Sequence, residues 1–115
     1  MNLIVLEGRL TKDPELRTTQ NGNKVTDVTL AINRKQKNAE GIYETDFLKV
    51  TLWNNKATNA CEYLRKGDLI SVQGRIENNI YERDGKTQYN LEIIGNEINF
   101  LSQKQRERND RDNER

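Results

Sequence analysis

The sequence predicts a small domain made mostly of β-strands with one helix, and three observations support that class. Short β-branched and apolar segments with period-two alternation recur along the chain. Turn signals, Asn21-Gly22 and Asp84-Gly85, separate some of these segments. Apolar residues recur at helical spacing in residues 57–64. A length of 115 residues suits one folding unit with a single core.

Three strands are predicted before the helix, over residues 3–10, 25–32 and 43–53. Gly8 lies inside the first strand, and an interior glycine often marks a bulge or a bend. In the second strand, Val28, Leu30 and Ile32 share one face and form a predicted core surface. Residues 33–41 are polar and rich in Lys, Arg and Asn, so they are predicted to be an exposed loop.

One short amphipathic helix is predicted after the third strand. Its apolar positions are Ala57, Ala60, Cys61 and Leu64. Asn54 or Asn55 can cap its N-terminus, and Gly67 provides a C-terminal stop.

Residues 69–77 alternate again and predict a fourth strand, with Ile70, Val72 and Ile76 facing inward. A hairpin centred on Asp84-Gly85 joins this strand to a fifth. Five strands with one helix between the third and the fourth is the element order of an OB-fold, a five-stranded Greek-key barrel.

Composition argues against several functional classes. The chain has 19 basic and 18 acidic residues, so a polyanion would have to bind at a local basic patch. Without histidine and with a single cysteine, the chain offers no disulfide, no usual transition-metal ligand set and no catalytic triad. We therefore predict no metal site, no cofactor and no enzymatic activity. A cytoplasmic protein without membrane contact is expected, because neither a signal peptide nor a run of about 20 apolar residues is present.

The predicted domain covers residues 1–102. Residues 103–115 have mixed charge and contain no apolar side chain. A segment that cannot bury apolar surface does not offset the entropy of ordering. These residues are therefore predicted to form a disordered tail.

The third strand carries the strongest functional signal. Alternation along DFLKVTLW (46–53) places Leu48, Val50 and Leu52 on the core face and, on the solvent face, Phe47, Lys49, Thr51 and Trp53. Proteins that bind single strands without sequence preference stack bases on aromatic rings and place cations along the backbone. Phe47 and Trp53 are therefore predicted to stack bases, and Lys49 to contact phosphate. The alternative is that both aromatics pack against a partner subunit or the helix.

Tyr81 adds an aromatic beside the long polar hairpin between strands four and five, a loop that binds oligonucleotides in OB-folds. The alternative for Tyr81 is an ordinary cross-strand contact. Further phosphate candidates, where they converge on the third strand, are Arg34, Lys35, Lys37, Lys56, Arg65 and Lys66. Taken singly, each is explained by solubility, and Arg65 and Lys66 also suit the helix dipole.

Four blocks occur together in the chain: LIVLEGRLTKDPELR (3–17), NGNKVTDVTLAINR (21–34), DFLKVTLWNNKATNACEYLRKGDLISVQGRI (46–76) and the Tyr81 hairpin. In this order they resemble the DNA-binding domain of bacterial single-stranded DNA-binding proteins. The likeness covers residues 1–102, and the combination of GRLTKDPELR with EYLRKGDLISVQGRI is specific.

The resemblance implies an OB-fold that assembles as a homotetramer, with a dimer as the alternative, and wraps single-stranded DNA without reading its sequence. It places stacking aromatics at Phe47, Trp53 and Tyr81. It places basic DNA-binding positions at Arg9, Arg17, Arg34, Lys49, Lys56 and Lys66. It also assigns part of the subunit interface to the first strand, through Leu3, Ile4, Val5 and Leu6.

Three features depart from the family pattern. Gln36 stands where the family often has a further stacking aromatic, and Glu77 stands where basic residues are frequent. Gln36 predicts one stacking site fewer, and Glu77 predicts weaker binding with a shallower salt dependence, because phosphate contacts are lost. The chain also ends in DNER (112–115) instead of an acidic and hydrophobic tip, so the resemblance indicates a short form whose recruitment of replication and repair proteins is in doubt.

The predicted function is sequence-independent binding and protection of single-stranded DNA during replication, repair, recombination or DNA uptake. Two alternatives share the fold. One is a primosome-type adaptor that binds DNA and protein, and the other is an RNA-binding OB-fold protein.

Overall fold

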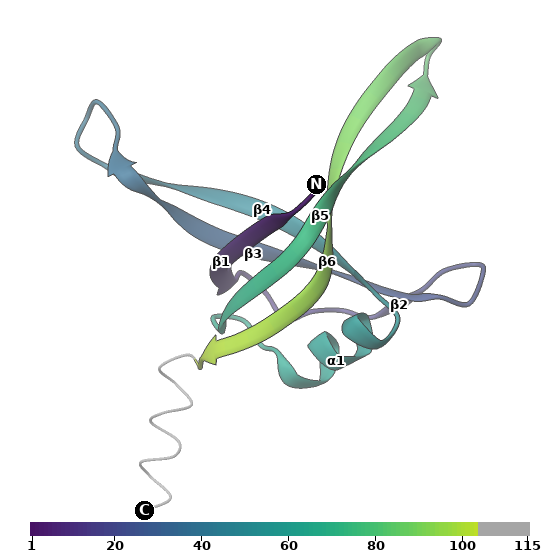
Figure 1. Cartoon of the computed structure of the whole chain (residues 1–115), viewed down its shortest axis with the longest axis horizontal. Helices are drawn as coiled ribbons and strands as arrows, with labels where there is room; N and C mark the ends of the chain where they lie inside the picture. Colours follow the sequence, from purple (N-terminus) through teal and green to yellow (C-terminus); the bar gives the residue numbers. More distant parts are fainter. Residues whose placement is uncertain (104–115) are drawn as a thin grey trace, which may run out of the picture.

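β-Branched and aromatic residues favour extended backbone, and the turn residues between them set where the chain reverses. The computed structural model describes residues 1–103, a part of the chain that contains six strands and one helix (Figure 1). In chain order these are β1 (Ile4–Leu10), β2 (Arg17–Thr18), β3 (Lys24–Lys37), β4 (Tyr43–Trp53), α1 (Asn55–Tyr63), β5 (Leu69–Arg83) and β6 (Lys86–Ser102).

Five of these strands close into a barrel, with β1, β5, β6, β4 and β3 as successive neighbours. The neighbours are antiparallel except β4 and β6, which run parallel. The barrel closes where β1 meets β3, at the pair Arg9 and Ala31 and the pair beside it. The two-residue β2 lies beside β3 and was not predicted. The predicted OB barrel, with its helix between the third and fourth barrel strands, is confirmed.

Alternating side chains of the barrel strands fill one core. Its most deeply buried members are at most 2% exposed, and they are Leu10, Val28, Leu30, Val50, Leu52, Ile70 and Val72. All but Leu10 stand at positions that alternation assigned to the core face. Ile76 was also predicted to face inward, but it is 37% exposed because β5 leaves the barrel at that point and continues as part of a hairpin.

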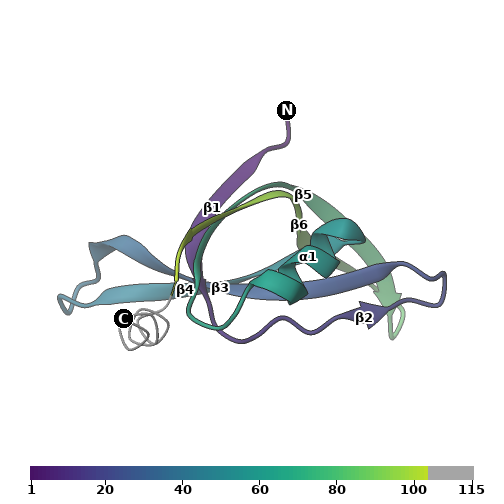
Figure 2. The same ribbon diagram turned by 90° about the horizontal axis from the view of Figure 1, so that it is seen from below.

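Helix α1 lies across the opening that β3 and β4 enclose together with β5 and β6 (Figure 2). Ala57, Ala60 and Leu64 are buried and belong to the core. Asn54 precedes the helix, but its side chain makes no capping bond. Instead its Oδ1 accepts a hydrogen bond from the Lys24 backbone N–H at 3.2 Å. This bond ties the corner between β4 and α1 to the beginning of β3.

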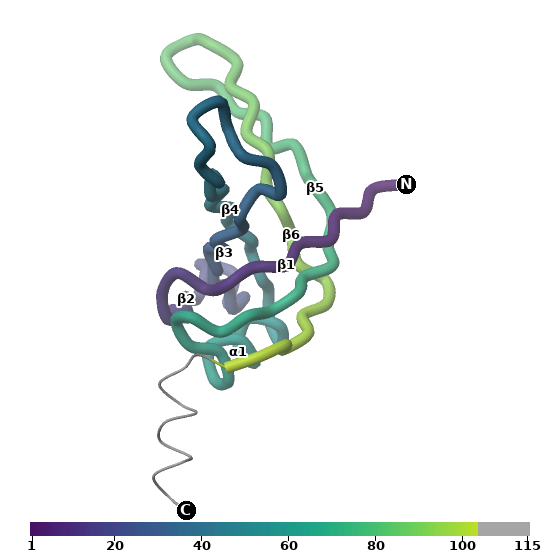
Figure 3. Tube along the Cα trace, turned by 90° about the vertical axis from the view of Figure 1, so that its left-hand side faces the viewer, coloured from purple at the N-terminus to yellow at the C-terminus, as the bar shows by residue number. Residues whose placement is uncertain are grey.

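Two long hairpins extend beyond the barrel, on the side away from α1 (Figures 1 and 3). We call residues 33–46 the β3–β4 arm and residues 77–92 the β5–β6 arm. The prediction of a loop over 33–41 is wrong for its first half, since β3 continues to Lys37. An arm that is exposed on both faces needs no apolar alternation, so the sequence carries no strand signal there.

The tip of the β5–β6 arm is the predicted turn. Asp84 and Gly85 both have positive φ, 54° and 76°, as a two-residue type I′ hairpin requires. Arg83 and Lys86 form the last pair before the turn, so β5 is six residues longer than the segment 69–77 that alternation predicted.

The last strand, β6, ends at Ser102, which is also the end of the predicted domain. The predicted tail lies outside the described residues except for Gln103. In the part of the chain that the structure covers, no helix combines the length and apolarity needed to cross a bilayer.

Two glycines allow strands to approach one another closely. A Cβ on Gly8 would lie 2.7 Å from the carbonyl oxygen of Ala31, at the seam between β1 and β3. A Cβ on Gly74 would collide with the carbonyl oxygen of Ile94, and the register of β5 and β6 shifts between Gln73 and Gly74. The bend expected at Gly8 and the register shift observed at Gly74 therefore both lie where a side chain does not fit.

Gly74→Ala is expected to lower the free energy of unfolding by about 1–3 kcal/mol, because the added methyl group forces the β6 backbone to move. Urea unfolding at one fixed protein concentration measures the change. Gln73→Ala, at the exposed neighbouring position, serves as the control and should cost much less. Equal stabilities of the two variants would show that β5 and β6 do not need to lie so close together at Gly74.

Candidate nucleic-acid interface

Burial along β4 follows the predicted alternation except at Leu48, which was predicted for the core face but is only half-buried and lines a surface hollow. Val50 and Leu52 are fully buried, whereas Phe47 is 65% and Trp53 39% exposed. Lys49 is exposed and Thr51 is half-buried between the two rings. We call Phe47, Lys49, Thr51 and Trp53 the outer row. With a rise of about 3.3 Å per residue, the row extends over about 20 Å.

A polar network lies beneath the Trp53 end of the outer row. Asp27 of β3 is paired with Thr51 of β4, and Thr51 Oγ1 donates a hydrogen bond to Asp27 Oδ1 at 2.8 Å. Arg17 of β2 pairs with the same carboxylate, with 3.2 Å between its Nη2 and Oδ2. Asp27 therefore positions Arg17 beside Trp53. The guanidinium remains exposed to solvent, where it can still reach an anion.

The surface is hollowed on both sides of Lys49. The Trp53 hollow, of about 400 Å³, is bounded by Arg17, Asp27 and Trp53. The Phe47 hollow, of about 320 Å³, is bounded by Phe47 and by Leu91 of the β5–β6 arm. Both hollows are lined by Lys49, Thr51 and Glu92. A ligand that follows the outer row therefore has space beside each of its two aromatic rings.

Glu92 brings a negative charge between the two hollows. It is half-buried, and its Oε1 accepts a hydrogen bond from Asn79 Nδ2 at 3.2 Å. Across residues 1–103, no carboxylate oxygen forms an ion pair with Lys49. The cation at the centre of the outer row is therefore available, while a carboxylate nearby repels anions from the floor of the hollows.

Tyr81 lies on the β5–β6 arm, where it pairs with Gln88. Paired residues in an antiparallel ribbon share a face, so Tyr81 shares a face with Asn90 and Glu92, which line the Phe47 hollow. The arm thus extends the surface of the outer row. Glu77, on the same arm, is ion-paired with Arg75 at 2.8 Å.

Arg34 is engaged within the β3–β4 arm. Its guanidinium contacts Glu44 at 2.6 Å and Asp46 at 3.0 Å. The hydrogen bond and charge of Asp46 raise the pKa of Arg34, and the hydrogen bond from Arg34 lowers the pKa of Asp46. Both groups therefore stay charged at neutral pH. On the same arm, Lys37 Nζ lies 5.5 Å from the centroid of the Tyr43 ring.

The other predicted cations lie in separate places. Lys56 is in the first turn of α1, with its Nζ 3.9 Å from Glu97. Arg9 and Lys35 line a different hollow, between β1 and β3, and Arg9 also donates to the Gly67 carbonyl at 2.8 Å. Lys66 follows α1, where its backbone N–H donates to Asp13. Of the predicted cations, only Arg17 and Lys49 line the hollows beside the outer row.

Of the predicted interface residues, Leu3 precedes β1, and Ile4, Val5 and Leu6 are the first three residues of that strand. Leu3 and Val5 are exposed, whereas Ile4 and Leu6 are half-buried and Leu6 packs against the core. Among residues 1–103, β5 is the only strand that pairs with Ile4–Gly8. One hydrogen-bonding edge of β1 is therefore unpaired in this part of the chain, and the apolar side chains of Leu3 and Val5 are exposed next to it.

Two acidic residues of the site were missed by sequence reasoning. Asp27 could have been found, because alternation puts it on the outward side of the second strand. Glu92 carries no local signal, since its position depends on the parallel pairing of β4 with β6, which are far apart in sequence. Within residues 1–103, no cluster of three or more acidic or cysteine side chains could hold a metal ion.

The sequence profile of the single-strand binding protein family matches residues 1–101. A single-stranded DNA-binding protein 3 from Listeria innocua is 47% identical over 106 residues, which cover 91% of this chain and 66% of that protein. A single-stranded DNA-binding protein from Bacillus cereus is 45% identical over 102 residues, or 88% of this chain and 60% of that protein. Single-stranded DNA-binding protein B from Bacillus subtilis is 44% identical over 108 residues, or 93% and 96% of the two chains.

The chain thus spans just under two thirds of the Listeria and Bacillus cereus relatives and nearly all of the Bacillus subtilis one. The family is described by binding and not by a reaction, in agreement with the prediction that the chain is not an enzyme. A profile match over residues 1–101, together with relatives more than 40% identical, shows that this chain belongs to the single-strand binding protein family.

Proposed function

We propose that the chain binds single-stranded DNA without reading its sequence, and that the outer row of β4 is the centre of the binding surface. The observation that carries this proposal is the alternation of two exposed aromatic rings with a cation, beside two hollows. Family membership and the names of the relatives support the choice of ligand.

In the proposed complex, bases stack on Phe47, Trp53 and Tyr81. Every base has a π-face, so stacking contributes about 1–3 kcal/mol per base without selecting a sequence. Phosphates meet Lys49 and Arg17 along the outer row. Arg9, Lys35, Lys56 and Lys66 extend the positive surface, and Arg34 joins it once it separates from Glu44 and Asp46.

This binding holds unwound strands open and protects them during replication, repair, recombination or DNA uptake in the cytoplasm. Residues 1–102 constitute the binding domain. A homotetramer, or a dimer, forms through the open edge of β1, where Leu3 and Val5 are exposed next to Ile4 and Leu6. A small core benefits from the additional apolar burial that such an interface provides.

Trp53→Ala is expected to weaken binding to oligo(dT) by about 5- to 150-fold, the loss that corresponds to one stacked base. Fluorescence anisotropy of a labelled oligomer measures the affinity. Trp53→Phe keeps an aromatic ring and should retain most of the affinity for oligo(dT). The mass of the assembly in solution should not change. Dissociation of the assembly in Trp53→Ala would instead favour packing of Trp53 in an interface, and equal affinity for RNA would favour the RNA-binding alternative.

Lys49→Gln is expected to reduce the slope of log K against log salt by about 0.7, the value for one phosphate contact on a single strand. Affinities at several salt concentrations measure the slope. The control is Lys12→Gln, which removes an exposed lysine outside the proposed surface and should lower the slope less. If the salt slope falls by the same amount in both variants, Lys49 makes no specific phosphate contact in the complex.

The double variant Glu44→Gln with Asp46→Asn is expected to bind DNA more tightly at low salt and to steepen the salt slope by about 0.7, because Arg34 becomes free to meet a phosphate. Glu15→Gln with Glu62→Gln changes the net charge equally at two exposed positions away from Arg34. An equal gain in both double variants would mean that only the total charge matters and that Arg34 has no role of its own.

A further inference from the structure

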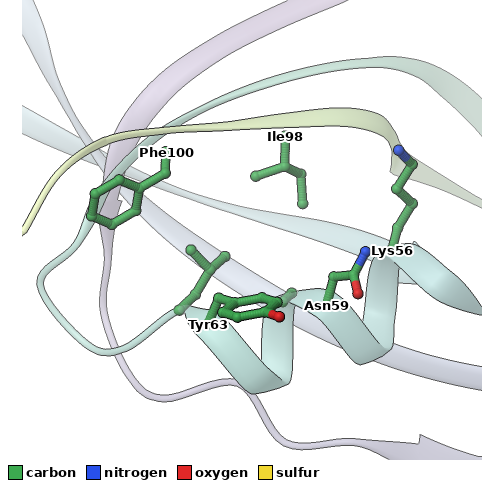
Figure 4. A pocket seen from close by; sticks show the side chains of 7 residues that line it. Lys56, Asn59, Tyr63, Ile98 and Phe100 are labelled. Carbon is green, nitrogen blue, oxygen red and sulfur yellow. The ribbon is translucent and has the colours of Figure 1, made fainter.

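A pocket of about 300 Å³ lies between α1 and the last part of β6, outside the outer row. Figure 4 shows Phe100 and Ile98 of β6 on one side, Tyr63 and Asn59 of α1 on the other, and Lys56 at one end. The remaining lining residues, Ala60 and Leu64, are buried members of the core. The pocket therefore has a fixed apolar floor.

Two aromatic side chains on this pocket are exposed to an unusual degree. Tyr63 is 70% and Phe100 49% exposed, although each has an apolar surface beside it. They come from different elements, one from the end of the helix and the other from the end of the last strand. A planar ligand that enters the pocket can contact an aromatic side chain on either side.

The polar groups of the pocket stand at its rim. Asn59 supplies an amide that both donates and accepts hydrogen bonds, and Lys56 supplies a cation. The only carboxylate paired with Lys56 among residues 1–103 is that of Glu97, at 3.9 Å and on an exposed side chain. An exposed pair at this distance contributes little and is readily exchanged for another anion.

The pocket shares no lining residue with the two hollows of the outer row, but its first residue, Lys56, follows the outer row closely along the chain. Trp53 ends β4, α1 begins two residues later, and Lys56 is the second residue of the helix. Because Asn54 fixes the corner through its bond to Lys24, the direction from the outer row to Lys56 is set by the fold. A strand that stacks on Trp53 and continues beyond it reaches Lys56 first and the two aromatics next.

We propose that this pocket is a second base-binding subsite, in which Lys56 holds a phosphate and one nucleobase inserts between Tyr63 and Phe100. The proposal rests on the proposed function, since it extends the path of the same single strand. A nucleotide suits the site because it combines a planar ring for the aromatics, polar edges for Asn59 and an anion for Lys56. A peptide with an aromatic anchor is the competing occupant.

The subsite predicts an effect that depends on DNA length. Tyr63→Ala should weaken binding of long dT oligomers on the order of tenfold, the loss expected for one stacked base. It should leave unchanged the shortest oligomers that still quench Trp53 fluorescence. Tyr63→Phe, which keeps the ring, should behave like the unmodified chain. Trp53→Ala, in contrast, should weaken binding at every length when affinity is measured by anisotropy.

Photocrosslinking locates the base directly. An oligomer carries one 5-iododeoxyuridine, which is moved a position at a time, and the complex with the whole protein is irradiated and digested with trypsin. Cleavage after Lys49, Lys56 and Arg65 places Trp53 and Tyr63 in separate peptides, 50–56 and 57–65. We expect some positions to crosslink to 50–56, and others, displaced along the strand, to 57–65 or to Phe100 itself. Fragment-ion sequencing must assign the second site, because the peptide 87–104 also contains the exposed Tyr89.

The proposal is overturned if crosslinks to 50–56 occur without any to Tyr63 or Phe100. It is also overturned if Tyr63→Ala binds oligomers of all lengths as well as the unmodified chain does. A pocket that binds a peptide instead of DNA would give both of these results. An equal loss at all lengths would also overturn it, since it indicates a general effect on the fold. Failure of the proposed function itself has a different signature, namely no Trp53 quenching by DNA of any length.

Discussion

The two-residue period of β4 within a closed barrel is the constraint on which the rest of the structure depends. Val50 and Leu52 must point into the core, together with the half-buried Leu48 on the same face, and full burial of such a side chain contributes about 1.5–3 kcal/mol. A slip of one residue would move all three into water, so the strand has one permitted orientation. That orientation also forces Phe47, Lys49 and Trp53 outward. The same burial that stabilises the barrel thus holds the outer row rigidly in place.

The fold could be predicted because its signals are local. Alternation identified the core faces of β3, β4 and β5, and Asp84-Gly85 identified the tip of the β5–β6 arm. The β3 strand of the β3–β4 arm, Asn33 to Lys37, could not be predicted. Its residues are polar, and only Asn33 and Lys37 pair with β4, without burying a face. Within the site, the outward placement of Phe47 and Trp53 followed from the pattern. The ion pairs of Arg34 and the place of Glu92 depend on residues distant in sequence.

The local arrangement of charge explains how a chain with a net charge of only +1 can present a surface for a polyanion. Carboxylates are present on the surface, but many are committed to nearby partners: Asp27 to Arg17, and Glu44 and Asp46 to Arg34. Lys49 stands apart from these pairs at the centre of the outer row. Glu92 lies between the hollows, and it repels phosphate from the floor while leaving the aromatic faces accessible to bases.

The most direct test of the central claim uses the intrinsic fluorescence of Trp53, the only tryptophan in the chain. Because its ring belongs to the outer row, a base that stacks there must change its emission. The account predicts saturable quenching on titration with oligo(dT), with a weaker effect from duplex DNA at the same nucleotide concentration. Binding of oligo(dT) that is detected by anisotropy but leaves the emission of Trp53 unchanged would contradict it.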